Sequence, residues 1–112
     1  MARTFYHVVH TDSPSLVDFL SAQARGRPLP DEEPETVRLH RGVSAYATAA
    51  QARRKAKASP PLGKYIARLE IPDDSPITWE RTLHSSGHHT LWGEPTDLVA
   101  CVVAVEPVRR VE

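Results

Sequence analysis

Several protein classes are excluded by what the sequence has little of. It contains one cysteine, Cys101, in 112 residues, so no disulfide can form within the chain. Cys101 lies inside the apolar run LVACVVAV, and we expect it to be a small buried side chain rather than a reactive thiol. No apolar run reaches the length of a membrane span, and the N-terminus lacks the apolar core of a signal peptide. We therefore expect a cytoplasmic protein with no membrane partner.

An excess of charge of either sign is also lacking. The formal net charge is zero, with 14 Lys and Arg residues against 14 Asp and Glu residues. Hydrophobic residues make up 40% of the chain and charged residues 25%, which is typical of a folded rather than a disordered protein. A chain of this length can bury one hydrophobic core, so residues 1–112 are predicted to form a single domain.

The charges are nevertheless unevenly distributed. Between Thr36 and Leu69 the chain has neither Asp nor Glu, but it has these basic residues: Arg38, Arg41, Arg53, Arg54, Lys55, Lys57, Lys64 and Arg68. Acidic residues flank this segment on both sides, beginning with DEEPE at 31–35. Two interpretations stay open, namely a face that binds phosphate or another anion, and a solvated segment that its acidic flanks neutralise.

Hydrophobic periodicity predicts the order of helices and strands. Strands are predicted at 3–11, 36–40, 64–72, 76–82, 88–92 and 97–108, and helices within TDSPSLVDFLSAQARG (11–26) and at 49–58. Asp12 or Ser13 is expected to cap the first helix, with Pro14 at its first position, and Thr48 to cap the second. The segment 97–108 is apolar on both faces, so we expect it to be the central strand. The prediction is an α+β domain with one mostly antiparallel sheet and two main helices.

The stretch SSGHHTLWGEP (85–95) invites interpretation as a metal site. His84 and His88 are four residues apart, which on a helix would present both rings to one metal. The intervening Ser85, Ser86 and Gly87 are typical of a turn, however, and no cysteine or acidic cluster accompanies the histidines. In a strand over 88–92, His88 and His89 would point to opposite faces. We therefore expect no metal.

Other side chains have both a structural and a functional interpretation. Tyr46 either packs against the base of the following helix or presents its ring to a flat heterocycle. Glu94 follows the predicted strand 88–92 at the mouth of the sheet, where a carboxylate can take part in catalysis. His7 and His10 are either hydrogen-bonded strand residues or donors to a ligand. Backbone N–H groups near the predicted cap Thr48 are able to meet an anion.

Common catalytic and nucleotide-binding motifs are not found. The sequence has no GxSxG elbow and its serines lie in contexts typical of caps and turns, which disfavours a Ser-His-Asp hydrolase. It also has neither GxxxxGK[ST] nor GxGxxG. The basic helix lacks the frame of a helix-turn-helix, so sequence-specific DNA binding is not indicated.

The order FYHVVH, helix, GVSAYAT, AAQARRKA, YIARLEIP resembles the first half of the ADP-ribosyltransferase superfamily, in its histidine-tyrosine-glutamate branch. The resemblance implies that the protein binds NAD as a possible substrate. It implies catalytic roles for His10 or His7, Tyr46 and Glu94, with Glu80 in TWERT as a competing acid. The NAD contacts implied by it come from these residues: His7, Arg41, Ser44, Thr48 and Trp92.

The segments SLVDFLS, GVSAYAT and GHHTLWGEP are also similar to those of small bacterial proteins of unassigned function. This second resemblance implies no activity, but it implies that a chain of this length is the natural unit. Two functional hypotheses result. The first is a small ADP-ribosyltransferase-like protein that binds NAD or a related phosphorylated ligand. The second is a non-catalytic module that docks on a protein or RNA through the basic helix 49–58.

Overall fold

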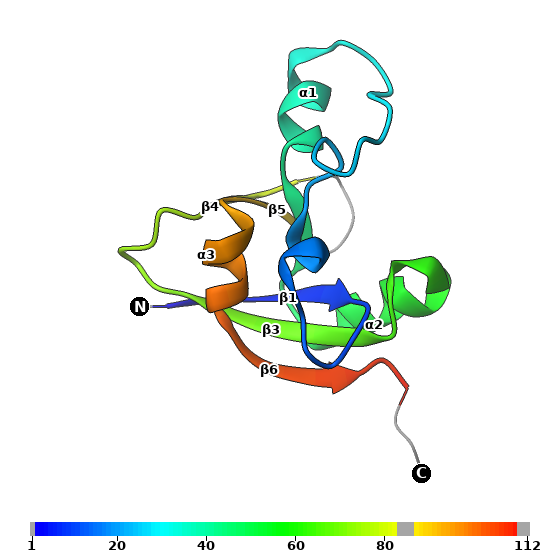
Figure 1. The fold of residues 1–112 in the computed structure, drawn as a ribbon, viewed down its shortest axis with the longest axis vertical. Helices are drawn as coiled ribbons and strands as arrows, with labels where there is room; N and C mark the ends of the chain where they lie inside the picture. The colour runs from blue at the N-terminus through cyan, green and yellow to red at the C-terminus, as the bar shows by residue number, and fades with distance from the viewer. Residues whose placement is uncertain (1, 83–86, 110–112) are drawn as a thin grey trace.

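The chain folds into one sheet with short helices on both faces (Figure 1). The computed structural model describes residues 2–82 and 87–109. In chain order the elements are β1 (Arg3–Val9), η1 (Leu16–Phe19), α1 (Pro34–His40), β2 (Val43–Tyr46), α2 (Ala49–Ala58), η2 (Pro60–Leu62), β3 (Tyr65–Ile71), β4 (Thr78–Arg81), β5 (His88–Trp92), α3 (Pro95–Ala100) and β6 (Val102–Pro107), where η denotes a 3₁₀ helix. This confirms the α+β class.

The sheet has six strands in the order β4-β5-β2-β1-β3-β6, and every neighbouring pair is antiparallel. The pairing of β1 with β3 extends over the full length of both strands, from Arg3–Ile71 to Val9–Tyr65. By contrast, β1 and β2 pair at one position, Tyr6–Tyr46. The join between β1 and β2 is therefore the pair of neighbouring strands with the fewest paired residues in the sheet.

One face of the sheet, here called the core face, carries the main hydrophobic core. The strands contribute alternate side chains to it. Three residues from outside the strands cover these side chains: Phe19 of η1, Leu98 of α3 and Ile77 of the β3–β4 connection. The strand residues of this core are Phe5, Val9, Val43, Ala45, Ala67, Leu69, Ile71 and Leu91. The alternation predicted for 3–11 and 64–72 is confirmed, because residues two apart in a strand point to the same face.

The opposite face, here called the α2 face, is covered in part by the second helix. Ala52 and Ala56 of α2 are buried against Val8 and Ile66 of the sheet. Their small side chains let the helix axis lie close to the strands. Thr48 caps the helix as predicted: its hydroxyl accepts a hydrogen bond from the N–H of Gln51. The helix ends at Ala58, before Pro60 and Pro61, as their missing N–H groups require.

The helix predicted within 11–26 is present only as a short 3₁₀ helix, and its N-cap is Ser15 rather than the predicted Asp12 or Ser13. The regular structure there is limited to η1, at Leu16–Phe19. The buried carboxylate of Asp18 accepts hydrogen bonds from the backbone N–H groups of His10 and Ser15, each at 3.0 Å. These bonds hold the connection from β1 folded back on itself. A short polar side chain that bonds nearby backbone in this way competes with helix formation.

The strand predicted at 36–40 is also wrong, because Pro34–His40 form helix α1. Five residues of mixed polarity fit both periodicities, and the signals that decide the matter lie just upstream. Pro34 occupies the first turn, and Glu35 pairs with Arg38 one turn later. The strand of this region is β2, at Val43–Tyr46, which the periodicity did not predict.

The central strand predicted at 97–108 is wrong as well. Pro95–Ala100 form α3, which buries Leu98 in the core, and β6 pairs with β3 at an edge of the sheet. The apolar run over 97–108 was interpreted as one strand because the apolar residues of α3 are followed, after Cys101, by those of β6. Val103 in that strand is 51% exposed, as an edge position allows. The domain thus has three α-helices in the described part of the chain, not two.

Cys101 lies between α3 and β6 and is partly exposed rather than buried. It packs against the edge of the main core. Burial, together with the nearby charge of Asp97, raises the pKa of its thiol above the usual value. A thiol with a raised pKa is a weak nucleophile at neutral pH, which agrees with a packing role. No helix among the described residues combines the length and apolar character that crossing a bilayer requires.

Candidate polar site on the sheet

The narrow join between β1 and β2 is filled by the side chain of His7. Its Nδ1 lies 2.7 Å from the backbone oxygen of Ser44 in β2, and its Nε2 lies 2.6 Å from the backbone oxygen of Asp18. The ring therefore takes the place of a ladder hydrogen bond that β1 and β2 do not make. Desolvation lowers the pKa of His7, while the two carbonyl groups act in the opposite direction.

On the α2 face, four polar side chains from three neighbouring segments form a hydrogen-bonded row. Nε2 of His88 lies 3.2 Å from the hydroxyl of Ser44, and Nδ1 lies 2.9 Å from the hydroxyl of Thr82. The hydroxyl of Thr82 is in turn 2.7 Å from that of Thr90. His88, Thr82 and Thr90 are buried, whereas Ser44 is exposed. The row thus leads from the protein surface into the sheet.

Tyr46 borders this row on the side of α2. It pairs with His88 in the β2–β5 register, and the two rings meet edge to face with centroids 5.4 Å apart. Half-burial raises the pKa of the Tyr46 hydroxyl. Desolvation lowers the pKa of His88, and the nearby charges of His89 and Lys55 lower it further. A histidine with a lowered pKa is neutral at pH 7 and is available as a base.

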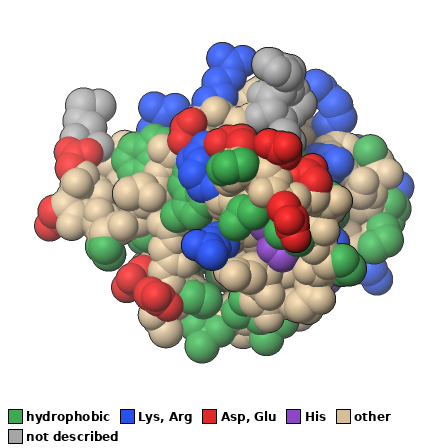
Figure 2. Space-filling model, turned by 90° about the horizontal axis from the view of Figure 1, so that it is seen from above, with side chains coloured by type: hydrophobic (Ala, Val, Ile, Leu, Met, Phe, Trp, Pro, Cys, Tyr) green, Lys and Arg blue, Asp and Glu red, His purple; other side chains and the backbone are tan. Residues whose placement is uncertain are grey.

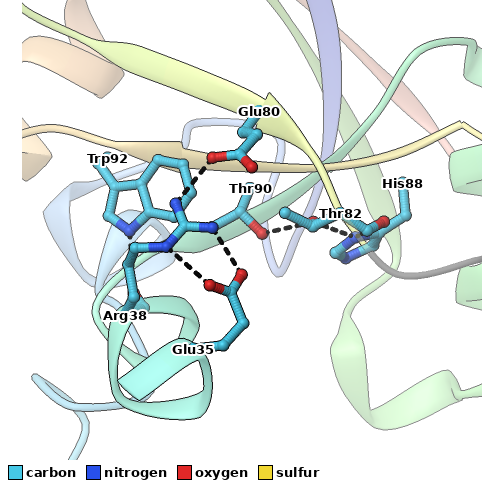
Figure 3. Close-up of polar contacts among 7 residues, drawn as sticks. All are labelled: Glu35, Arg38, Glu80, Thr82, His88, Thr90 and Trp92. Carbon is cyan, nitrogen blue, oxygen red and sulfur yellow. Dashed lines mark hydrogen bonds and ion pairs between the residues drawn. The ribbon is translucent and has the colours of Figure 1, made fainter.

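A second polar group lies at the α1 side of the same face (Figure 3). The guanidinium of Arg38 stacks over the ring of Trp92, 4.7 Å from its centroid, and the indole N–H donates to the backbone oxygen of Arg38 at 3.0 Å. Arg38 also pairs with Glu35 at 2.6 Å and with Glu80 at 2.8 Å. These two carboxylates raise the pKa of the guanidinium. The side chains are largely exposed, so the group is a solvated ion-pair network.

The structure brings together some of the residues implied by the family resemblance. Ser44 and Tyr46 lie on the α2 face of β2, and Thr48 follows two residues after Tyr46 as the cap of α2. His7 bonds the backbone oxygen of Ser44, but its ring lies on the opposite, core face, where it contacts Phe19. His10 lies just beyond the end of β1 with an exposed side chain. No side-chain bond found in the described part of the chain links His10 to this cluster.

The remaining predicted residues lie elsewhere. Tyr46 faces His88 at the start of β5, whereas Trp92 is at its end, and the five residues of the strand span about 13 Å. Arg41 is at the corresponding end of β2, next to α1. Glu94 comes two residues after Trp92, as the exposed N-cap residue of α3. The predicted set is therefore divided between the two ends of β2 and β5.

The competing acid, Glu80, shares the face of Tyr46. Glu80 pairs with Thr90 on β5, and Thr90 pairs with Ser44 on β2, so the three form one row across the sheet. Adjacent strands are about 4.8 Å apart, which puts Glu80 two strands away from Ser44. Its carboxylate is bound to Arg38 rather than directed at Tyr46.

The histidines of SSGHHTLWGEP do not form a joint metal site. His88 and His89 are neighbours in β5 and point to opposite faces: His88 to the α2 face, and His89 to the core face, where it contacts the ring of Phe5. His84 lies outside the described residues. Within 2–82 and 87–109 there is no group of three His, Cys, Asp or Glu side chains suited to holding a metal ion.

The basic segment is partly neutralised by the acidic flanks. Arg38 pairs with Glu35 and Glu80, Arg53 pairs with Glu106, and Arg68 lies 3.6 Å from Glu70. Figure 2 views the molecule from the α1 end and shows acidic side chains gathered in the middle of that face, with Lys and Arg among and around them. Within the basic segment, five cations have no carboxylate partner among the described residues: Arg41, Arg54, Lys55, Lys57 and Lys64.

The Ser44–His88–Thr82 row was not predicted from the sequence. Ser44 was placed in a turn context, and His88 was considered chiefly as a metal ligand. A strand assignment for 43–46 would have placed Ser44 and Tyr46 on one face. The register that pairs this strand with β5 joins segments 44 residues apart in the chain, and no local signal specifies it.

A scan against protein-family models found no match, and neither did searches of the curated proteins and of the solved structures. The site must therefore be interpreted from its own geometry.

Proposed function

We propose that the protein is a small ADP-ribosyltransferase-like domain that binds NAD, or a related phosphorylated ligand, on the α2 face beside the join of β1 and β2. The observation that carries the proposal is the half-buried ring of Tyr46 on the α2 face, whose centroid lies 5.4 Å from that of the His88 ring and which comes two residues before Thr48, the N-cap of α2. The family resemblance implies a first-strand histidine close to a tyrosine that precedes a helix. This chain supplies both residues from paired strands, but the ring of His7 lies on the core face against Phe19, so of the two only Tyr46 is on the α2 face.

The surroundings of Tyr46 suit a flat, anionic ligand. Its ring is half-buried and has His88 at its edge, so one aromatic surface is fixed in place. The N-terminus of α2 begins at Thr48, and Lys55 lies near enough for its charge to act on His88. A helix N-terminus and a lysine both favour phosphate. A nicotinamide or adenine ring on Tyr46, with its phosphates toward α2, satisfies these features together.

Isothermal titration calorimetry with NAD tests the proposal. We expect saturable binding at about millimolar NAD and its loss in Tyr46→Ala, because removing the ring removes the stacking surface. Glu94→Ala is the matched control: the residue belongs to the set implied by the resemblance, but it lies at the far end of β5. Its binding should equal that of the unaltered protein. The absence of binding to the folded, unaltered protein at millimolar NAD contradicts the proposal.

A second candidate function is docking on RNA or an acidic protein surface through α2. It is favoured by the exposed side chains of Arg54, Lys55 and Lys57, for which the described residues provide no carboxylate partner. Binding of a single-stranded RNA, followed by fluorescence anisotropy, should weaken steeply with added salt. The double variant Arg54→Glu, Lys57→Glu should abolish it, and Tyr46→Ala should not. RNA binding that is equal in the double variant and the unaltered protein rejects α2 as its RNA-docking surface.

A further inference from the structure

We propose that Ser44 and His88 form a nucleophile–base pair that accepts an acyl group from a small activated ester. Ser44 is an exposed residue of β2, and its hydroxyl lies 3.2 Å from Nε2 of the buried His88 on β5. A nucleophile within hydrogen-bond reach of a base, which a third group orients, is the arrangement that activates serine hydroxyls. The inference uses neither NAD nor the resemblance, so it goes beyond the function proposed above.

The backbone of Thr82 determines which nitrogen of His88 carries the proton. Nδ1 lies 3.3 Å from the carbonyl oxygen of Thr82 and 2.9 Å from its hydroxyl. A carbonyl oxygen only accepts, so the arrangement favours a proton on Nδ1, shared between these two acceptors. The Thr82 hydroxyl then donates to Thr90, which lies buried behind it (Figure 3). Nε2 is left with its lone pair facing the hydroxyl of Ser44.

Burial lowers the pKa of His88 most, against the opposing hydrogen bond to the Thr82 carbonyl, and the charges around the ring act with burial to keep it unprotonated. On its own strand, the adjacent His89 opposes protonation, and from α2 the ammonium of Lys55 does the same. Tyr46, whose ring packs against that of His88 from β2, adds no charge at pH 7, and burial raises its pKa further above neutrality. No carboxylate of the described residues is bonded to the imidazole ring. His88 therefore accepts a proton when a substrate arrives and is not already protonated.

The step balances with these groups alone. Oγ of Ser44 attacks the carbonyl carbon of the ester and forms the new C–O bond, while its proton passes to Nε2 of His88. The bond to the leaving oxygen then breaks, and that oxygen takes the proton from Nε2 and departs as the alcohol. A water molecule repeats the sequence on the acyl-serine and releases the carboxylic acid. Tyr46, two residues along the same face, offers a ring to an aryl group of the substrate.

The experiment uses p-nitrophenyl acetate without NAD, with peptide mass mapping to locate the acetyl group. We expect Ser44 to be acetylated at least 10-fold faster than Ser13, an exposed serine whose hydroxyl makes no bond to a histidine in the described chain. Ser44→Ala should remove this reaction and Ser13→Ala should preserve it. His88→Gln should slow it about 100-fold or more, the usual contribution of a general base. Equal rates at Ser44 and Ser13 overturn the proposal.

The pH dependence of the unaltered protein keeps the proposal testable if His88→Gln does not fold. Acetylation of Ser44 should lose rate as the pH falls through the lowered pKa of His88 and should level off above about pH 7. A rate that instead rises about tenfold per pH unit up to pH 9 indicates hydroxide catalysis and leaves the pair a structural hydrogen bond.

Discussion

The two faces of β5 differ in what holds their buried side chains, although they share one short strand. Leu91 is fully buried on the core face, where Phe5 and Leu98 belong to the same apolar cluster. His88 and Thr90 are buried on the α2 face, and their partners are hydroxyl groups. Burial of apolar area stabilises the fold without fixing the geometry of individual atoms, whereas a buried polar row is tolerated only when its bonds are made. We therefore expect the core face to supply most of the stability and the α2 face to carry the candidate chemistry.

The largest expected effect tests the core face. Leu91→Ala leaves a cavity among fully buried side chains, and we expect the free energy of unfolding to fall by about 2–5 kcal/mol. Urea denaturation measures it. Val103→Ala, on the exposed edge strand β6, is the control and should change the free energy by no more than about 0.5 kcal/mol. Equal losses in the two variants would mean that the core face does not dominate the stability.

The next effect tests how closely the α2 face is packed. A methyl group added at Gly42 would overlap Cγ2 of Thr90 and would lie 3.1 Å from the backbone oxygen of Leu91. We expect Gly42→Ala to lower the free energy of unfolding by about 1–3 kcal/mol. Thr90→Ser removes Cγ2 and keeps the hydroxyl that bonds Thr82. Combined with Gly42→Ala, it should restore part of the loss, and a purely additive result speaks against the contact.

The sequence could predict features that depend on one segment alone, but not those that depend on how distant segments pair. Period-two alternation identified β1 and β3, because each of these strands has one more buried face. β5 was also predicted at its observed bounds, although both of its faces are buried. The helices α1 and α3 were missed although each has proline at its first turn, since their short apolar stretches fit a strand equally well. The neighbours of Ser44 depend on which strands pair and in what register. That information is distributed over the whole chain, so motifs within one segment did not contain it.

A smaller effect concerns pH. Burial is the main cause of the lowered pKa of His88, so the folded protein binds this proton less readily than the unfolded chain, whose histidines titrate near 6.5. As the pH falls, the unfolded chain therefore takes up this proton at a higher pH than the folded protein does. The free energy of unfolding should decrease as the pH falls below about 6.5. His7 acts in the same direction. In His88→Gln the decrease should be smaller, as urea denaturation at several pH values measures. An unchanged pH dependence would contradict a lowered pKa.

The smallest effect is expected at the exposed end of the α2 face. Arg38→Gln removes the ion pairs to Glu35 and Glu80 and the charge stacked on Trp92. Because the side chains are exposed, we expect a small drop in Tm that disappears in high salt, where surface charges are screened. Arg54→Gln, on α2, is the matched control and should show no such dependence on salt. If the drop at Arg38 persists in high salt, its contact with the ring of Trp92 matters more than its ion pairs. The α2 face would then extend as one packed surface from Tyr46 to Trp92 rather than ending in a solvated rim.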